Sequence, residues 1–233
     1  MKKTLIVVVL LMGAFQVESQ SNSELLKHFE AYYEQMKSQG DVQGVTNALT
    51  HLIVLQPSQA RKDTLAILYM NNGKHIQALN TIGIEKNPED SDMAVEVKAL
   101  CLQALNQPEK SLEHFEVLFK RSPNAMIAYE LADLKIQTGD LIGANLNITY
   151  GIANAKEGTF HTYYEMQQPY QVPMKVAFLY LKSLAKFREN PETNTDAAVA
   201  ILEEAMQLAP HFNLAKISKD ALLAQKNTPQ KNE

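Results

Sequence analysis

Histidine, cysteine and paired carboxylates are the residues best able to do chemistry, and in this chain they stand apart from one another. The six histidines are scattered along the sequence, which has neither an H-E-x-x-H pattern nor a paired Cys/His spacing for a metal. It also lacks a G-x-S-x-G nucleophile elbow and a phosphate-binding loop. Glu203 and Glu204 are expected to be solvated charges on a helix. The sequence therefore predicts a non-enzymatic protein without catalytic residues, metal or cofactor.

The densest group of functional side chains is the stretch TFHTYYEMQQPYQVP, residues 159–173, which fits neither a helical nor a strand period. Its rings are Phe160, Tyr163, Tyr164 and Tyr170. Two interpretations stay open. The rings fold back over apolar surface, or some tyrosines form a recognition surface with the ring as platform and the hydroxyl as handle. His161, between these rings, is expected to pack rather than titrate.

Composition limits the classes of partner. The 233 residues have a formal charge of -4, and a nucleic-acid-binding protein needs a concentrated basic face. We therefore expect no nucleic-acid partner. The single cysteine, Cys101, cannot form a disulfide within the chain and is expected to be a buried thiol.

The amino terminus resembles a bacterial secretory signal. Lys2 and Lys3 precede an apolar run over residues 5–15, which is too short for a membrane span of about 20 residues. We predict that residues 1–19 are a signal peptide cut before Gln20, and that no cysteine is available there for a lipid anchor. The remaining chain is expected to be periplasmic or extracellular, without stable membrane insertion and not a lipoprotein.

A 33-residue period runs through the first two thirds of the chain. Turn-compatible residues recur at Gly40, Gly73, Asn106 and Gly139, and small residues recur at Ala66, Ala99 and Ala132. Within each period, apolar residues at three- and four-residue steps predict two amphipathic helices. A fixed period of this size is typical of a solenoid. Pro88 stands two residues early relative to Pro57 and Pro123, which indicates a small deletion in the second unit.

The pattern resembles the tetratricopeptide repeat, which has small and large apolar residues at fixed helix positions and a closing proline. The second unit matches at Leu65, Ala66, Tyr69, Ala78, Ile82 and Pro88, and a fifth unit at Ala198, Leu202, Ala205 and Pro210. The resemblance implies an all-α, right-handed α-solenoid of about five helix-turn-helix repeats with a C-terminal capping helix. The expected repeats are 24–57, 58–90, 91–123, 124–156 and 174–210, with an insertion at 157–173, a cap at 211–225 and a disordered tail at 226–233.

The resemblance also implies which residues line the concave wall, because the first helix of each repeat faces it. An apolar, methionine-bearing wall suits adaptable recognition of a partner helix. Together with the insertion, the predicted partner-binding residues are Ile67, Met70, Leu100, Met126, Tyr129, Asp133, Ile136, Tyr163 and Tyr164. The alternative is that the insertion or a shifted helix already fills the groove.

These features predict a protein-interaction module, a scaffold or adaptor of the bacterial envelope, with a protein or peptide partner. The alternative function is a small-ligand or glycan receptor that uses the aromatic insertion as a stacking surface.

Overall fold

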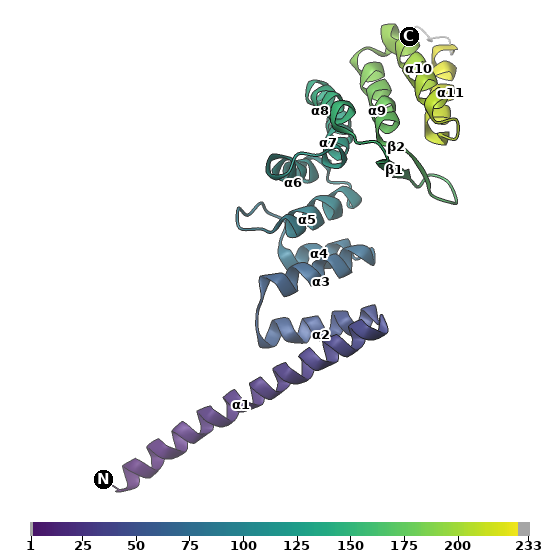
Figure 1. Cartoon of the computed structure of the whole chain (residues 1–233). Helices are drawn as coiled ribbons and strands as arrows, with labels where there is room; N and C mark the ends of the chain where they lie inside the picture. The colour runs from purple at the N-terminus through teal and green to yellow at the C-terminus, as the bar shows by residue number, and fades with distance from the viewer. Residues whose placement is uncertain (1, 228–233) are drawn as a thin grey trace. The chain divides into compact units, whose positions relative to one another are not determined.

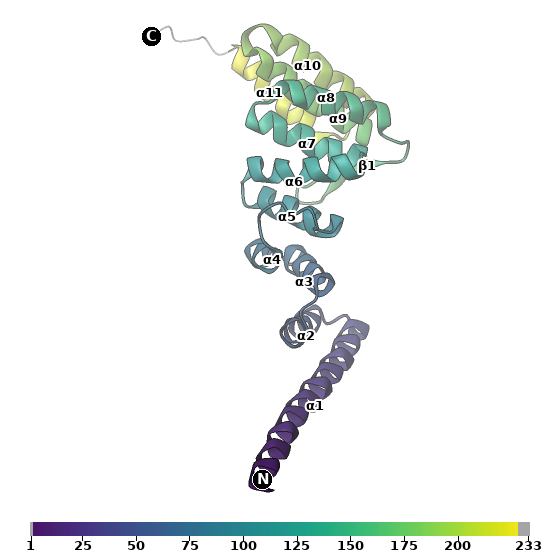
Figure 2. The same ribbon diagram turned by 90° about the vertical axis from the view of Figure 1, so that its left-hand side faces the viewer.

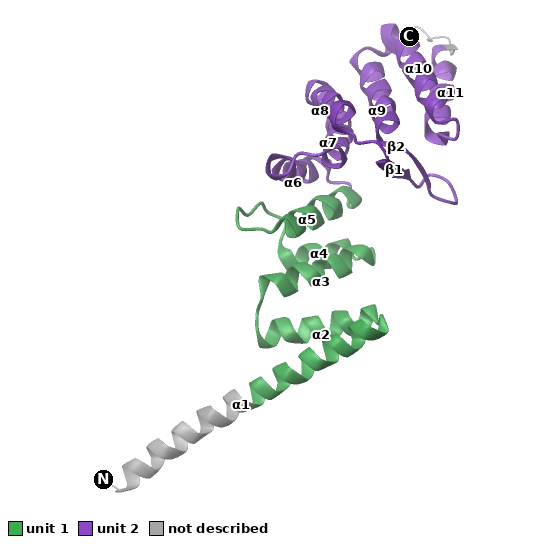
Figure 3. Cartoon of the chain, in the orientation of Figure 1, with its two compact units in different colours: residues 1–105 green, residues 106–233 purple. Residues whose placement is uncertain are grey.

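The computed structural model describes the backbone of residues 2–227 and the side chains of residues 21–226. The side chains of the predicted signal peptide, and residues 228–233 of the predicted tail, lie outside this part. The chain forms two compact units, Met1–Leu105 and Asn106–Glu233 (Figure 3). Eleven helices and two strands make up the described backbone (Figure 1).

Unit 1 contains five helices, each packed against the next in chain order. They are α1 (Lys2–Gln39), α2 (Val42–Leu55), α3 (Gln59–Asn71), α4 (His75–Ile82) and α5 (Asp92–Ala104). In addition, α3 contacts α5, so the first helices of successive hairpins are also neighbours.

Unit 2 is also built mainly of helices (Figure 2), and a β-hairpin lies between α8 and α9 in the sequence (Figure 1). Its elements are α6 (Pro108–Arg121), α7 (Ala125–Thr138), α8 (Leu141–Asn154), β1 (Phe160–Tyr163), β2 (Tyr170–Pro173), α9 (Met174–Glu189), α10 (Pro191–Leu208) and α11 (Asn213–Asn227). Consecutive helices pack together, and α7 also contacts α9.

The 33-residue period sets the turn inside each helical hairpin. Gly40, Gly73, Asn106 and Gly139 all have positive φ, between 56° and 88°. Glycine adopts this left-handed conformation at no steric cost, and asparagine tolerates it better than most residues. These recurring residues therefore stand where a helix ends, and Gly40, Gly73 and Gly139 lie in the turns between paired helices of one unit.

The same period sets the starts of the first helices. The side chains of Ser58, Ser91 and Asn124 accept hydrogen bonds from the backbone N–H three residues on, and so cap α3, α5 and α7. Each cap satisfies one N–H that has no partner inside the helix, and replacing such a residue by alanine costs about 1 kcal/mol.

Small side chains allow the helices to approach closely. The repeating alanines Ala66, Ala99 and Ala132 have no exposed surface. In unit 2, a Cβ atom placed on Gly151 of α8 would overlap the ring of Phe178 on α9. That ring is fully buried, and it occupies the space that a side chain at position 151 of α8 would need.

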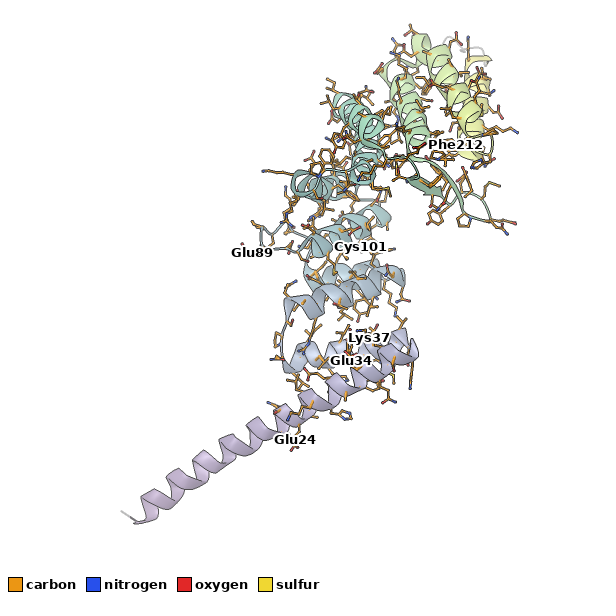
Figure 4. All side chains as sticks on the ribbon, viewed as in Figure 1. Glu24, Glu34, Lys37, Glu89, Cys101 and Phe212 are labelled. Carbon is orange, nitrogen blue, oxygen red and sulfur yellow. The ribbon has the colours of Figure 1, made fainter. Side chains whose placement is uncertain are left out.

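Helix α4 is short, and the loop after it has its own anchor. Residues 83–91 follow the early end of α4 at Gly83, whose φ is +86°. Lys98 of α5 donates to the carbonyl oxygen of Glu85 at 2.8 Å and to Asp90 Oδ2 at 2.6 Å. The two charged side chains are only 2% and 6% exposed. The loop is therefore held on the helix by a buried ion pair, close to the exposed Glu89 (Figure 4).

The aromatic stretch forms a structure that its residue pattern does not predict. Strands β1 and β2 pair antiparallel, with Phe160 opposite Pro173 and Tyr163 opposite Tyr170. Each strand has four residues, which is too short for a clear alternation of polar and apolar side chains. Strand structure is therefore a correction to the expectation of a stretch without a period, within a fold that is otherwise helical.

Candidate functional site

The inner face of the hairpin contacts the predicted wall of unit 2. Tyr163 lies against Phe212, with ring centroids 4.9 Å apart, and its hydroxyl is 2.8 Å from the hydroxyl of Tyr129 on α7. The ring of His161 lies 3.9 Å from that of Tyr129. Tyr129 and Tyr163 are each 6% exposed. The hairpin therefore covers the centre of α7.

Burial changes the acid–base behaviour of these groups. Desolvation raises the pKa of Tyr129 and of Tyr163 well above the usual range, so both hydroxyls stay neutral. Desolvation also lowers the pKa of His161 to about 4. The imidazole is therefore neutral at physiological pH, and the site is an uncharged aromatic cluster rather than an acid–base pair.

The second strand is fixed to the start of α11. The hydroxyl of Tyr170 donates to Glu165 and accepts the backbone N–H of Leu214 at 3.1 Å. Nε2 of His211 lies 2.8 Å from the carbonyl oxygen of Gln171. Figure 4 marks Phe212, beside His211, at this end of unit 2. The hairpin thus joins α7, α9 and the beginning of α11 into one packed region.

The predicted wall residues of unit 2 separate into two groups. Tyr129 and Ile136 are buried, at 6% and 2% exposure, and offer no accessible surface for a partner in this structure. Met126 is 52% exposed. Asp133 is half-buried and accepts a hydrogen bond from Gln137 Nε2 at 2.7 Å.

Burial disfavours the ionised form of Asp133 and so raises the pKa of this carboxyl. The hydrogen bond from Gln137 and the positive charge of Arg188 lower the same pKa, and burial is the larger effect. Arg188 of α9 donates to the carbonyl oxygen of Ile136 at 2.6 Å, near the end of α7. Arg188 therefore ties α9 to the end of α7, whereas the bond between Asp133 and Gln137 lies within α7.

Within the insertion, the two predicted tyrosines differ. Tyr163 packs inward, as the folded-back interpretation expects, whereas Tyr164 is 75% exposed. Phe160 is 47% exposed, and every residue from 164 to 169 is exposed. The outer face and the tip of the hairpin are the accessible parts of this aromatic stretch.

The predicted residues of unit 1 remain accessible. Ile67 and Met70 of α3 and Leu100 of α5 are half-buried, and their helices are in contact. Asp63, one turn before Ile67, is buried and accepts a hydrogen bond from Ser91 Oγ at 2.7 Å. This carboxylate is an anchor for the start of α5, a role that its place in the repeat did not predict.

Each unit also has surface cavities. One in unit 1, of about 350 Å³, lies beside α1 and α3, where Arg61 and Glu30 form an ion pair at 2.9 Å. One in unit 2, of about 340 Å³, is lined by Met126, Tyr150 and Lys156 among others. Within the described residues, no group of three acidic, histidine or cysteine side chains is placed to hold a metal ion.

Known structures show the fold. The chain is similar to a tetratricopeptide repeat protein from Parabacteroides merdae, with 18% identity, a TM-score of 0.64, and coverage of 89% of this chain and 75% of that chain. It is also similar to the MamA protein, with 13% identity, a TM-score of 0.57, and coverage of 90% and 100%. No model of a known protein family and no curated protein matches the chain.

The packing of consecutive helices and these similarities confirm the predicted fold class. The protein is an all-α solenoid of the tetratricopeptide-repeat type. Among the described residues, no helix has both the length and the apolar character to cross a membrane.

Proposed function

We propose that the chain is a non-enzymatic protein-interaction module, a scaffold or adaptor of the bacterial envelope. Its partner is a protein that presents an amphipathic helix to the first helices of unit 1. The similarity to tetratricopeptide repeat structures supports a protein partner, and the signal-like residues 1–19 support a location beyond the inner membrane.

The observation on which the proposal rests is the apolar surface shared by α3 and α5. Ile67 and Leu100 occupy the same position of successive repeats, and Met70 lies one turn after Ile67. All three side chains keep part of their surface accessible on helices that touch. A groove of this composition suits the apolar face of a helix, and the flexible thioether of Met70 adapts to different side chains.

Unit 2 has less accessible apolar surface for a partner helix. Two of its predicted wall residues, Tyr129 and Ile136, are buried, and a partner helix would have to displace the hairpin to reach Tyr129. The energetic cost of removing the Tyr163 ring from its cluster makes that displacement unfavourable. The proposal therefore assigns the binding wall to unit 1.

A photo-crosslinking experiment tests this assignment. A benzophenone amino acid at position 70 is expected to capture a defined envelope protein in cells, and Leu100→Glu in the same chain is expected to abolish that product. The matched control places the benzophenone at Ile142 of α8, which is 80% exposed and lies outside the wall. Circular dichroism shows whether each variant is folded.

Two outcomes would overturn the proposal. One is a product that survives Leu100→Glu in a folded variant, and the other is capture at position 142 but not at position 70. The glycan alternative gives a different result. Binding of an oligosaccharide would be lost in Tyr164→Ala, whose ring is 75% exposed, and kept in Leu100→Glu.

A further inference from the structure

The hairpin has one strand edge that is open. We propose that the outer edge of β1 pairs antiparallel with β1 of a second copy of this chain, so that the two hairpins form one continuous four-stranded sheet. This self-association is independent of the helix-binding wall proposed for unit 1.

The register of the hairpin identifies the backbone groups at that edge. The N–H of Met174 donates to the carbonyl oxygen of Thr159 at 2.9 Å, and hydrogen-bonded pairs alternate along an antiparallel ladder. Residues 161 and 163 therefore bond inward to β2, whereas Phe160 and Thr162 direct N–H and C=O outward. The outward carbonyl of Gln171 on β2, which lies 2.8 Å from His211 Nε2, agrees with this alternation.

The two edges of the hairpin differ in protection. The edge of β2 is blocked by Pro173, which has no N–H, and by the contact between Gln171 and His211. The edge of β1 has no proline, no charged residue and no bulge, which are the usual devices against pairing. In the described part of the chain, the outward backbone groups of Phe160 and Thr162 have no hydrogen-bond partner.

The side chains beside this edge can pair with the same set of side chains in a second copy. Phe160 and Thr162 stand at alternate positions of β1, on the face of the hairpin opposite the buried Tyr163, and the exposed Tyr164 follows directly after the end of the strand. With Thr162 of the two copies opposite one another, Phe160 of each copy faces Tyr164 of the other. Such aromatic cross-strand pairs stabilise a sheet, and Thr–Thr pairs do so as well.

The pairing fits less well if His161, instead of Thr162, lies opposite its own copy. Tyr164 would then face Gly158, whose φ of +80° interrupts the strand and which has no side chain to pack. Symmetric pairing through identical residues is also the commonest way in which two copies of one chain associate. The open edge, its exposed rings and its register therefore favour a second copy as occupant.

Disulfide trapping tests the predicted register. Cα atoms of a hydrogen-bonded antiparallel pair lie about 5.5 Å apart, within the range that a disulfide spans. Thr162→Cys is therefore expected to give a covalent dimer under mild oxidation. Gln171→Cys, directly across the hairpin from Thr162, is the matched control and is expected to stay monomeric. The native Cys101 is fully buried and does not compete.

A backbone substitution tests the hydrogen bonds. Thr162→Pro removes an outward N–H but no backbone hydrogen bond of the hairpin, and is expected to weaken self-association about tenfold in analytical ultracentrifugation. Thr162 Oγ1 also accepts a hydrogen bond from Gln171 Nε2 at 3.3 Å, which is lost in Thr162→Pro and Thr162→Val alike, so the comparison of these two variants isolates the backbone N–H. Thr162→Val keeps the N–H and is expected to retain the dimer. The edge is short, so the association belongs to the weak class with less than about 1,200 Å² buried, and high protein concentration is needed.

The proposal is overturned if the unmodified chain stays monomeric at high concentration. It is equally overturned if Thr162→Cys and Gln171→Cys crosslink to the same extent, or if Thr162→Pro associates as the unmodified chain does. Capture of an extended peptide from another protein at this edge, without self-association, would identify a different occupant and reject the second copy.

Discussion

Two segments depart from the 33-residue period, and the chain secures them by opposite means. The loop 83–91, where the repeat is shortened, is held by the buried charges of Lys98 and Asp90. The hairpin, where the repeat is lengthened, is held by uncharged rings around Tyr163. A short loop has few side chains to pack, so one strong polar contact fixes it, whereas a longer insertion brings its own apolar surface.

The two anchors leave different amounts of the predicted wall accessible in the two units. The anchor of the loop lies at Lys98, and Ile67, Met70 and Leu100 remain accessible in the same unit. The anchor of the hairpin includes Tyr129, a predicted wall residue, which it buries. An insertion that packs on the predicted wall of a repeat therefore covers part of that wall and exposes its own outer face and tip instead.

The largest effect is expected from the ionic anchor. Asp90→Asn leaves the charge of Lys98 buried without its carboxylate, and breaking a buried pair in this way costs about 3–5 kcal/mol in free energy of unfolding. Urea denaturation measures the loss. Glu89→Gln, on the same loop but exposed, is the matched control and is expected to stay within about 0.5 kcal/mol of the unmodified chain. Equal stability of the two variants would contradict a structural role for the pair.

The next effect concerns the aromatic anchor. Tyr163→Ala removes a buried ring and is expected to cost about 3 kcal/mol, and amides of β1 and β2 should then exchange faster with deuterium. Tyr164→Ala is the matched control, because this ring is the same residue type, adjacent in sequence and 75% exposed. A hairpin as protected in Tyr163→Ala as in Tyr164→Ala would show that the rings do not hold it.

A smaller effect isolates the hydroxyl pair. Tyr129→Phe leaves the hydroxyl of Tyr163 buried without a partner, and is expected to cost about 1–2 kcal/mol. Removing both hydroxyls, in Tyr129→Phe with Tyr163→Phe, is expected to cost less than the single change, because no polar atom is then left unsatisfied. With Tyr163→Phe alone as the second single variant, urea denaturation of these three variants and the unmodified chain gives the coupling energy. Strictly additive losses would refute the pairing.

The smallest effect is a dependence on pH. The pKa of His161 is about 4 in the folded chain, below its value of about 6.5 in an unfolded chain. The unfolded state binds the proton more readily between these values, so stability is lost as the pH falls from about 6.5 to about 4. In His161→Gln, the midpoint of urea denaturation is expected to change less with pH between about 4 and about 6.5. Asp133, with its raised pKa, contributes with the opposite sign, and the difference between the two chains isolates the imidazole.

The sequence was sufficient for features that depend on local spacing. The left-handed turn residues and the small buried residues at Ala66, Ala99 and Ala132 recur with the period, so the helical pairs and the fold class could be predicted. The exposed Met126 and the half-buried Ile67 also lie on the predicted first helices. Whether these residues bind a partner stays a prediction.

The remaining features depend on contacts between distant residues. Tyr129 and Tyr163 are 34 residues apart, and no periodic pattern indicates that they meet. Lys98 has the sequence context of a surface lysine, yet it is buried and bonded to Glu85 and Asp90 of the loop that follows α4. The sequence did contain one signal of the irregular loop that Lys98 binds. Pro88 stands two residues early, which marks the second repeat as shortened in this region.

The close approach of α8 and α9 constrains how this chain can vary over evolutionary time. Position 151 has no room for a side chain while a phenyl ring occupies position 178. Descendants that acquire alanine or serine at the first position should therefore carry a smaller residue at the second, and the two substitutions should appear together. A collection of orthologues would show this as covariation between two sites that are 27 positions apart in the printed sequence.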